Sequence, residues 1–267
     1  AGIIYTSIAD SYEDFAFSDR KEASPPVGPS NMQSVYDQAI SFLDQGLALA
    51  RELGDSSLVD RMLAQRARAR HGRAVWQKLQ SINPQDALVS DAQANADARA
   101  ALDRLGAEDW SFGVEYSSAT VTNNMGDWVN DRSEMAVGPA YVDYSDEVRR
   151  VPDNVILMDP IDQIPDPVAH QRIFEEFIGG GLYPSITVVS ARELHLILAE
   201  SALSDGDMAG FTEHINAVRA FDGLTPYSGQ VDALGLLRHE RRVNLMFQMR
   251  RIQDHYRFGD PSELWAP

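Results

Sequence analysis

Apolar residues recur at helical spacing along the first hundred residues of the chain. They predict a run of helices joined by short turns, interrupted once by a proline-rich connector at 24–30. The helices are expected over about residues 1–17, 30–53, 57–80 and 86–105. Alanines stand where facing helices would touch, so the pattern is typical of stacked antiparallel helical hairpins such as tetratricopeptide repeats.

The pattern changes between residues 108 and 189. Glycine, proline, asparagine and aspartate become frequent, aromatic residues are scattered among them, and helical periodicity is lost over most of the segment. Short strands are predicted at 114–116 and 155–158, and one helix over 166–178. We expect an irregular, aromatic-rich insertion.

Helical periodicity returns at Ser190, a good N-cap with Glu193 at the position that completes a capping box. Helices are predicted over 191–203, 208–221 and 231–258. The fold class is therefore mainly α, with stacked tetratricopeptide-like helical hairpins and a loop-rich middle insertion. Its regions, 1–107, 108–189 and 190–267, are expected to form one structural unit.

Charge and composition exclude several classes of function. The 267 residues carry a formal net charge of −17, so the surface repels phosphate backbones and no nucleic-acid partner is expected. There is no cysteine, which excludes disulfides, thiolate zinc sites and a cysteine nucleophile. No apolar stretch is long enough to span a bilayer.

Three charged blocks follow one another in the last third of the chain. They are Glu193–Leu203, then Gly206-Asp207 leading to Ile215–Arg219, and His239–Arg242 leading to Arg250–Gly259. In order and spacing they resemble the SusD/RagB family of outer-membrane nutrient-binding lipoproteins, and the alanine-rich 66–70 looks like that family's hairpin helix. Asn244 and Gln248 depart from it, since the family often has glutamates there.

The resemblance implies a surface-exposed lipoprotein of the cell outer membrane. Such a protein acts as the lid of a SusC-like TonB-dependent transporter, captures an oligosaccharide or a peptide, and delivers it to the channel. Family members are usually longer and begin with a lipidated cysteine. We therefore expect that an N-terminal part with the lipid anchor is not present in this chain.

Several charged residues of these blocks lie on helices that must pack together. Charges persist at helix interfaces when they are paired and hydrogen-bonded, so we favour structural ion pairs over ligand contacts. The residues are Glu200, Arg219, Glu240, Arg241, Arg250, Asp254 and Arg257.

The aromatic residues of the insertion are the better candidates for ligand binding. Sugars stack their C–H faces on aromatic rings, while neighbouring polar groups satisfy their hydroxyls. The candidates are Trp110, Tyr116, Trp128, Tyr141 and Tyr144. The alternative for each ring is that it fills the insertion's own core.

Catalytic and cofactor motifs are not indicated. The run Asp127–Asp131 offers oxygens to calcium but lacks a full calcium-binding loop, and the six histidines show no zincin pairing. No catalytic residue, metal or cofactor is predicted, and we expect no enzyme activity. Two rival functions stay open: a helical-repeat scaffold that binds a protein partner, and an α-helical glycoside hydrolase.

Overall fold

The computed structural model describes residues 1–18, 21–22, 24–79, 86–145 and 152–259, and its fold is mainly α-helical, as predicted. The first part contains α1 (Gly2–Ser11), a short 3-10 turn at Pro29–Asn31, α2 (Gln33–Leu53), α3 (Ser56–Lys78) and α4 (Ala92–Leu105). Aspartates set two of the helix starts. Asp55 accepts a hydrogen bond from the backbone of α3, and Asp91 does the same for α4.

Two of these helices are shorter than the sequence predicts. The helix expected over 1–17 ends at Ser11, because Tyr12 is extended and the rings of Phe15 and Phe17 pack on each other, 5.0 Å apart. The helix expected from residue 86 begins only at Ala92. Residues 86–90 form no helix, and the backbone N–H of Val89 donates to the buried carboxylate of Glu200 on another helix.

The insertion contributes two small antiparallel sheets. Strand β1 (Ser111–Val114) pairs with β4 (Ile186–Ser190), and β2 (Val142–Asp143) pairs with β3 (Asn154–Val155). Both strand predictions are displaced. The first strand covers 111–114, where the residues find a partner in β4, and overlaps the predicted 114–116 only at Val114. The second strand ends at Val155, the first residue of the predicted 155–158.

Helical turns of the insertion flank these strands. They are α5 (Asn124–Gly126), the π-helical segment η2 (Asp127–Asp131), α6 (Pro167–His170) and the π-helical segment η3 (Gln171–Ile178). Asp166 caps α6 by accepting from the backbone N–H of Ala169. The helix predicted over 166–178 is thus confirmed, although its second half is π-helical.

The last part contains α7 (Ala191–Ser204), α8 (Met208–Ala220), α9 (Ala233–Asn244) and α10 (Arg251–Phe258). The predicted cap is confirmed, since the hydroxyl of Ser190 accepts from the backbone N–H of Glu193. The single helix predicted over 231–258 is wrong. It breaks after Asn244, where Phe247 and Met249 adopt left-handed backbone angles.

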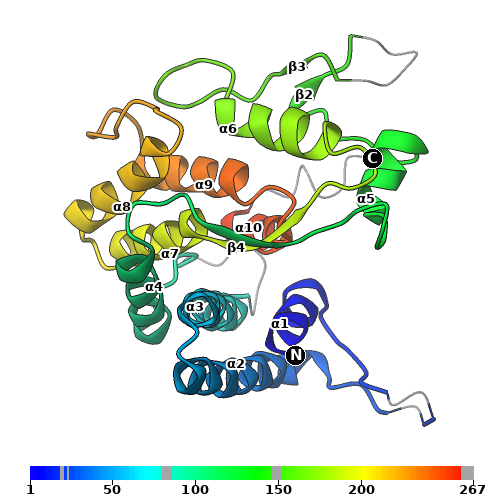
Figure 1. Ribbon diagram of the computed structural model, residues 1–267. Coiled ribbons are helices and arrows are strands. Elements are labelled where there is room, and N and C mark those ends of the chain that lie inside the picture. The colour runs from blue at the N-terminus through cyan, green and yellow to red at the C-terminus, as the bar shows by residue number, and fades with distance from the viewer. Residues whose placement is uncertain (19–20, 23, 80–85, 146–151, 260–267) are drawn as a thin grey trace.

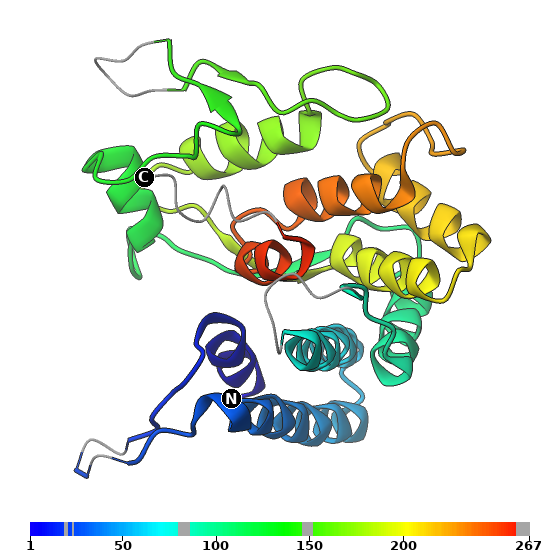
Figure 2. The ribbon, with the colours of Figure 1, turned by 180° about the vertical axis from the view of Figure 1, so that it is seen from behind.

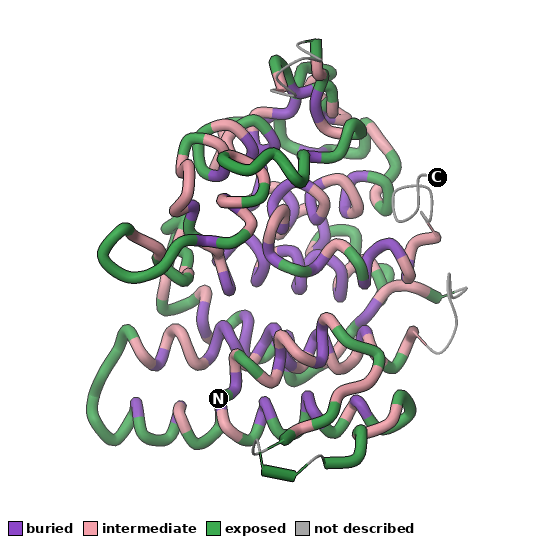
Figure 3. Tube along the Cα trace, turned by 90° about the vertical axis from the view of Figure 1, so that its right-hand side faces the viewer, coloured by how far each residue is buried: buried purple, intermediate pink, exposed green. Residues whose placement is uncertain are grey.

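The helices stack in layers that place the insertion at one side. Helix α3 packs between α2 and the pair α4 and α7, while α7 also contacts α8 and α9 (Figure 1). The reverse view shows α10 close to α7 and α9, with the insertion on the side away from α2 (Figure 2). Buried residues concentrate on the central helices, and the outer side of α2 is exposed (Figure 3).

The core between these helices is built largely from small and aliphatic side chains. Ala64, Ala67 and Ala98 are fully buried between α3 and α4, where their size lets the helices approach closely. A second cluster around Phe211 and Ile215 closes α7 against α8. Within the described residues, no helix combines the length and the apolar character needed to cross a membrane.

Candidate functional site

A network of buried charges joins helices from both ends of the chain. At its centre Glu200 of α7 is fully buried and pairs with Arg257 of α10. The guanidinium of Arg241 lies 3.2 Å from the same carboxylate, and His71 of α3 lies at the same distance. Asp254 completes the group, because it accepts from Arg241 at 2.9 Å and from Arg257 at 2.7 Å.

The electrostatics of this centre favour the ionised acids. Burial by itself opposes ionisation of Glu200, but Arg257, His71 and Arg241 outweigh it and hold its pKa well below the usual range. Burial also opposes ionisation of Asp254, and Arg241 and Arg257 lower its pKa in the same way. The centre is therefore a set of full charges that stabilise one another inside the protein.

A second part of the network links α1 and α3 to the break between α9 and α10. Arg250 donates to Glu193 at 2.6 Å and to the backbone carbonyl of Val188 at 3.1 Å. Arg68 pairs with Asp10, which also accepts a hydrogen bond from the hydroxyl of Tyr36 at 2.8 Å. The carboxylates of Asp10 and Glu193 both lie within 4.0 Å of Arg68 and Arg250, so these four residues tie α1, α3 and α7 to the α9–α10 connection.

Arg219 forms a separate buried cluster that ties α8 to α9 and to the insertion. Its guanidinium donates to Asp159 at 2.8 Å and to Glu240 at 2.6 Å. Burial raises the pKa of Glu240 to about 7, although Arg219 and His239 counteract it. All seven charged residues singled out from the sequence are thus engaged in buried ion pairs with other helices or with the insertion.

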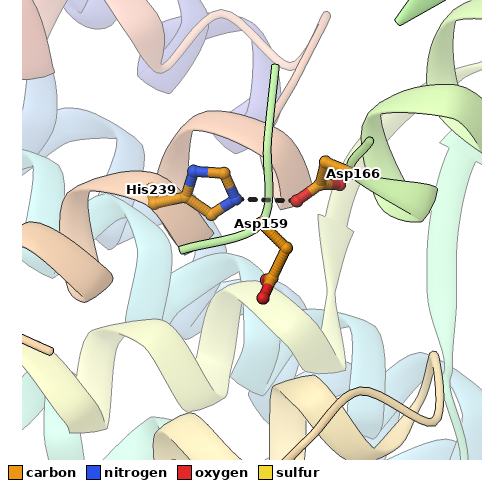
Figure 4. A group of neighbouring side chains, drawn as sticks. All are labelled: Asp159, Asp166 and His239. Atoms are coloured by element: carbon orange, nitrogen blue, oxygen red, sulfur yellow. Dashed lines mark hydrogen bonds and ion pairs between the residues drawn. The ribbon is translucent and has the colours of Figure 1, made fainter. Parts of the chain in front are cut away.

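Asp159, Asp166 and His239 bring oxygen and nitrogen atoms within 4.8 Å of one another, the spacing of a metal site. Figure 4 shows that His239 points at Asp166, to which its Nε2 lies at 2.7 Å, while the Asp159 carboxylate turns away from both. That carboxylate accepts from Arg219 and from two backbone N–H groups, and Asp166 caps α6. Because Arg219 already supplies the positive partner of Asp159 and Asp166 is engaged as a helix cap, we assign this group to the fold.

A largely apolar cavity of about 230 Å³ lies between the insertion and the α9–α10 connection. Methionine and aromatic side chains form much of its wall: Met125, Met135, Tyr141, Phe177, Met246 and Phe247. The rings of Phe177 and Phe247 stack with their centroids 4.4 Å apart. The guanidinium of Arg242 lies 4.4 Å from the ring centroid of Tyr141, and Arg251 also reaches the cavity.

A second cavity of about 240 Å³ adjoins the first. The two share the wall formed by Val129, Met135 and Val137, and Tyr144 lines the second. The hydroxyl of Tyr144 donates to the backbone carbonyl of Val137 at 2.7 Å, which fixes the ring, and burial raises its pKa. Together the cavities can hold an elongated ligand that contacts both apolar surface and a few polar groups.

The five aromatic candidates do not form one site. Tyr141 and Tyr144 line the adjoining cavities. Trp128 is 37% exposed, and its backbone carbonyl accepts from Glu134 and Met135, so it supports the cavity wall from the neighbouring turn. Trp110 packs against the α3–α4 core, where it serves the fold, and half-buried Tyr116 lines neither of the two cavities.

Several residues of the buried charge network and of the apolar cavity could not be identified from the sequence. Asp10 and Arg68 look like ordinary helix residues until their partners, far along the chain, are known. Met246 and Phe247 lie within a predicted helix, but the break of that helix turns them into the cavity. The segment Asp127–Asp131, considered for calcium, forms the π-helical turn η2 instead of a loop.

Comparison of the chain with protein-family models, with curated proteins and with solved structures finds no match.

Proposed function

We propose that this chain captures an oligosaccharide or a peptide in the cavity beside Tyr141 and passes it to a SusC-like TonB-dependent transporter of the outer membrane. The proposal joins the resemblance of the three C-terminal blocks to the SusD/RagB family with the position of the cavity. It treats the chain as a binding protein that does not transform its ligand.

The observation that carries the proposal is the pairing of Tyr141 with Arg242 at the cavity wall. The cation lies against the aromatic ring, which restrains Tyr141 without filling the cavity. A restrained ring loses little conformational freedom when a sugar face or an apolar side chain stacks on it. Arg242 and Arg251 add polar groups where hydroxyl or carbonyl oxygens would lie.

The helical layers support the proposal by holding one wall of the cavity in place. Met246 and Phe247 project from the break between α9 and α10, and that break is tied to Glu193 by Arg250. A binding wall on a rigid platform preserves its shape before ligand arrives, which lowers the cost of binding. The opposite wall of the cavity comes from the insertion, whose loops can differ in sequence without disturbing the helical layers.

Isothermal titration of the purified chain with a panel of neutral oligosaccharides and short peptides tests the proposal. We expect saturable binding of at least one ligand, and binding about 5-fold weaker or more for Tyr141→Ala, since one stacked ring contributes about 1 kcal/mol. Tyr12→Ala is the matched control, because Tyr12 is an exposed tyrosine next to α1. Equal affinities for the two variants would exclude the cavity as the site.

A scaffold that binds a protein partner is the second candidate. Leu49 and Leu53 lie one turn apart on α2 and are 52% and 66% exposed, an arrangement that suits a partner helix or loop. Co-purification from detergent-solubilised membranes distinguishes the candidates. A β-barrel transporter among the captured proteins supports the lid function. In a separate assay, steady release of sugar products from a glycan would instead indicate a hydrolase.

A further inference from the structure

Two histidines on neighbouring helices face each other through the same ring atom. His195 lies on α7 and His214 on α8, and their Nδ1 atoms are 3.3 Å apart, with ring planes tilted by 42°. The fully buried Leu196 and Phe211 belong to the cluster that packs α7 against α8. The two imidazoles are therefore held on a rigid pair of helices.

We infer that His195 and His214 form a chelating site for a divalent transition-metal ion such as Zn²⁺ or Cu²⁺. Two metal–nitrogen bonds of about 2.0–2.1 Å at a tetrahedral angle place the nitrogens about 3.3–3.4 Å apart. The observed distance of 3.3 Å between the two Nδ1 atoms equals that separation. Neutral imidazole is a preferred ligand of zinc, copper and nickel.

His214 also contributes to the wall of a polar cavity of about 270 Å³ between α4, α7 and α8. The carboxylates of Asp205 and Asp207 line the same cavity. Asn95, whose residue is more than nine-tenths buried, also lines it and leaves its side-chain oxygen without a hydrogen-bond partner. Water ligands of a bound ion can occupy this space and donate hydrogen bonds to these oxygens.

The charges around the pair act in both directions. Burial is the largest influence on His214 and its pKa is lowered; Glu213 and Asp207 act to raise that pKa, and Arg99 of α4 acts to lower it. Burial, with a further contribution from His214, lowers the pKa of His195 to about 4. Because the described residues supply two imidazole ligands to this site, we expect a dissociation constant in the micromolar range, smaller for Cu²⁺ than for Zn²⁺.

His195 and His214 are 19 residues apart and lie on different helices, so they do not form the zincin-type pairing that predicts a metal site from sequence. The competing interpretation of the geometry is a direct hydrogen bond, in which one Nδ1–H donates to the other Nδ1. Metal binding requires both rings to carry their proton on Nε2 instead. The two interpretations therefore differ in the tautomer and in the response to metal.

Isothermal titration of the metal-free chain with ZnCl₂ and with CuCl₂, at pH 7, tests the inference. We expect one equivalent of metal to bind, and affinity to fall at least about 10-fold in His214→Ala and in His195→Gln. His170→Ala is the matched control, because His170 is an exposed histidine of the insertion and its loss should leave the affinity unchanged. Circular dichroism establishes that each variant is folded.

Nitrogen chemical shifts of the imidazoles provide a second readout that does not depend on the variants. Addition of Zn²⁺ should shift the Nδ1 signals of both rings together, and chelator should reverse the shift. No saturable binding by the wild-type chain, or binding retained in folded His214→Ala, would overturn the inference in favour of a hydrogen-bonded pair. The outcome is independent of the proposed ligand capture, because this cavity shares no lining residue with the one beside Tyr141.

Discussion

Replacement of Glu200 by glutamine tests the role of the buried charge network most severely. The wild-type carboxylate accepts from the backbone N–H of Val89 at 3.0 Å and pairs with Arg257. His71 and Arg241 lie 3.2 Å away. Glutamine keeps the size and one acceptor oxygen, but it removes the negative charge and turns amide donors towards guanidinium groups.

The expected loss of stability comes from the buried arginines that lose the negative charge of Glu200. After the substitution Asp254 is the acid within the described residues that still pairs with both Arg257 and Arg241, and both arginines remain buried. Removal of one partner from a buried ion pair costs about 3–5 kcal/mol, and we expect the free energy of unfolding to fall by that amount in Glu200→Gln. This is a large part of the about 5–15 kcal/mol that stabilises a typical protein.

Urea unfolding followed by tryptophan fluorescence measures the change. Asp37→Asn is the matched control, since it removes a carboxylate that pairs with Arg73 at 2.9 Å on the surface, with half of the Asp37 side chain exposed. The control should lose less than about 1 kcal/mol. A loss in Glu200→Gln no greater than in the control would refute the claim that the buried network fastens the helices.

Three further predictions concern the same framework. As pH falls below about 4.5, the stability advantage of the wild type over Glu200→Gln should shrink, because the folded state holds the pKa of Glu200 low and the unfolded state takes up the proton first; urea titrations from pH 7 to 3 measure this. Met249→Gly should raise the free energy of unfolding by about 1 kcal/mol, since Met249 is exposed at a φ of 62° that disfavours a side chain; an unchanged urea midpoint would contradict this. Gly72→Ala should lower it by about 1–3 kcal/mol, because the added carbon would lie 2.9 Å from the ring of Tyr36; calorimetry should report a reduced melting temperature.

Local signals in the sequence predict the helices well where the caps and the periodicity agree. Ser190 with Glu193 marks the start of α7, and the predicted starts of α7 at 191 and of α8 at 208 both match the structure. These effects involve residues three or four positions apart. They depend little on the rest of the fold, so the pattern of residues is sufficient to find them.

The break between α9 and α10 is not predictable in the same way. Residues 231–258 keep a helical pattern, yet Arg250 must reach Glu193 and Val188, which lie on other elements. A continuous helix would give Phe247 and Met249 ordinary backbone angles, whereas both are left-handed here. The tertiary ion pair prevails over the local preference, and its partner is 57 residues away.

The candidate site could be predicted from the sequence only in part, again because contacts between distant residues decide it. Aromatic residues in an irregular segment indicate two possible roles, and only the fold separates them. Trp110 joins the α3–α4 core, while Tyr141 reaches the cavity because Arg242 and Phe247 come close to it from the α9–α10 region. The opposite wall of the cavity is formed by Met246 and Phe247, which the sequence pattern predicts to lie within a continuous helix.

The most direct test of ligand capture uses the methionine methyl groups as reporters. Met125, Met135 and Met246 line the cavity beside Tyr141, whereas Met62 packs against the α2–α3 core and Met208 begins α8. We predict that titration with an oligosaccharide or peptide that binds the chain shifts the methyl signals of Met125, Met135 and Met246 in ¹³C-methionine spectra. The signals of Met62 and Met208 should stay unchanged. Shifts confined to Met62 and Met208 would contradict the assignment of the cavity as the binding site.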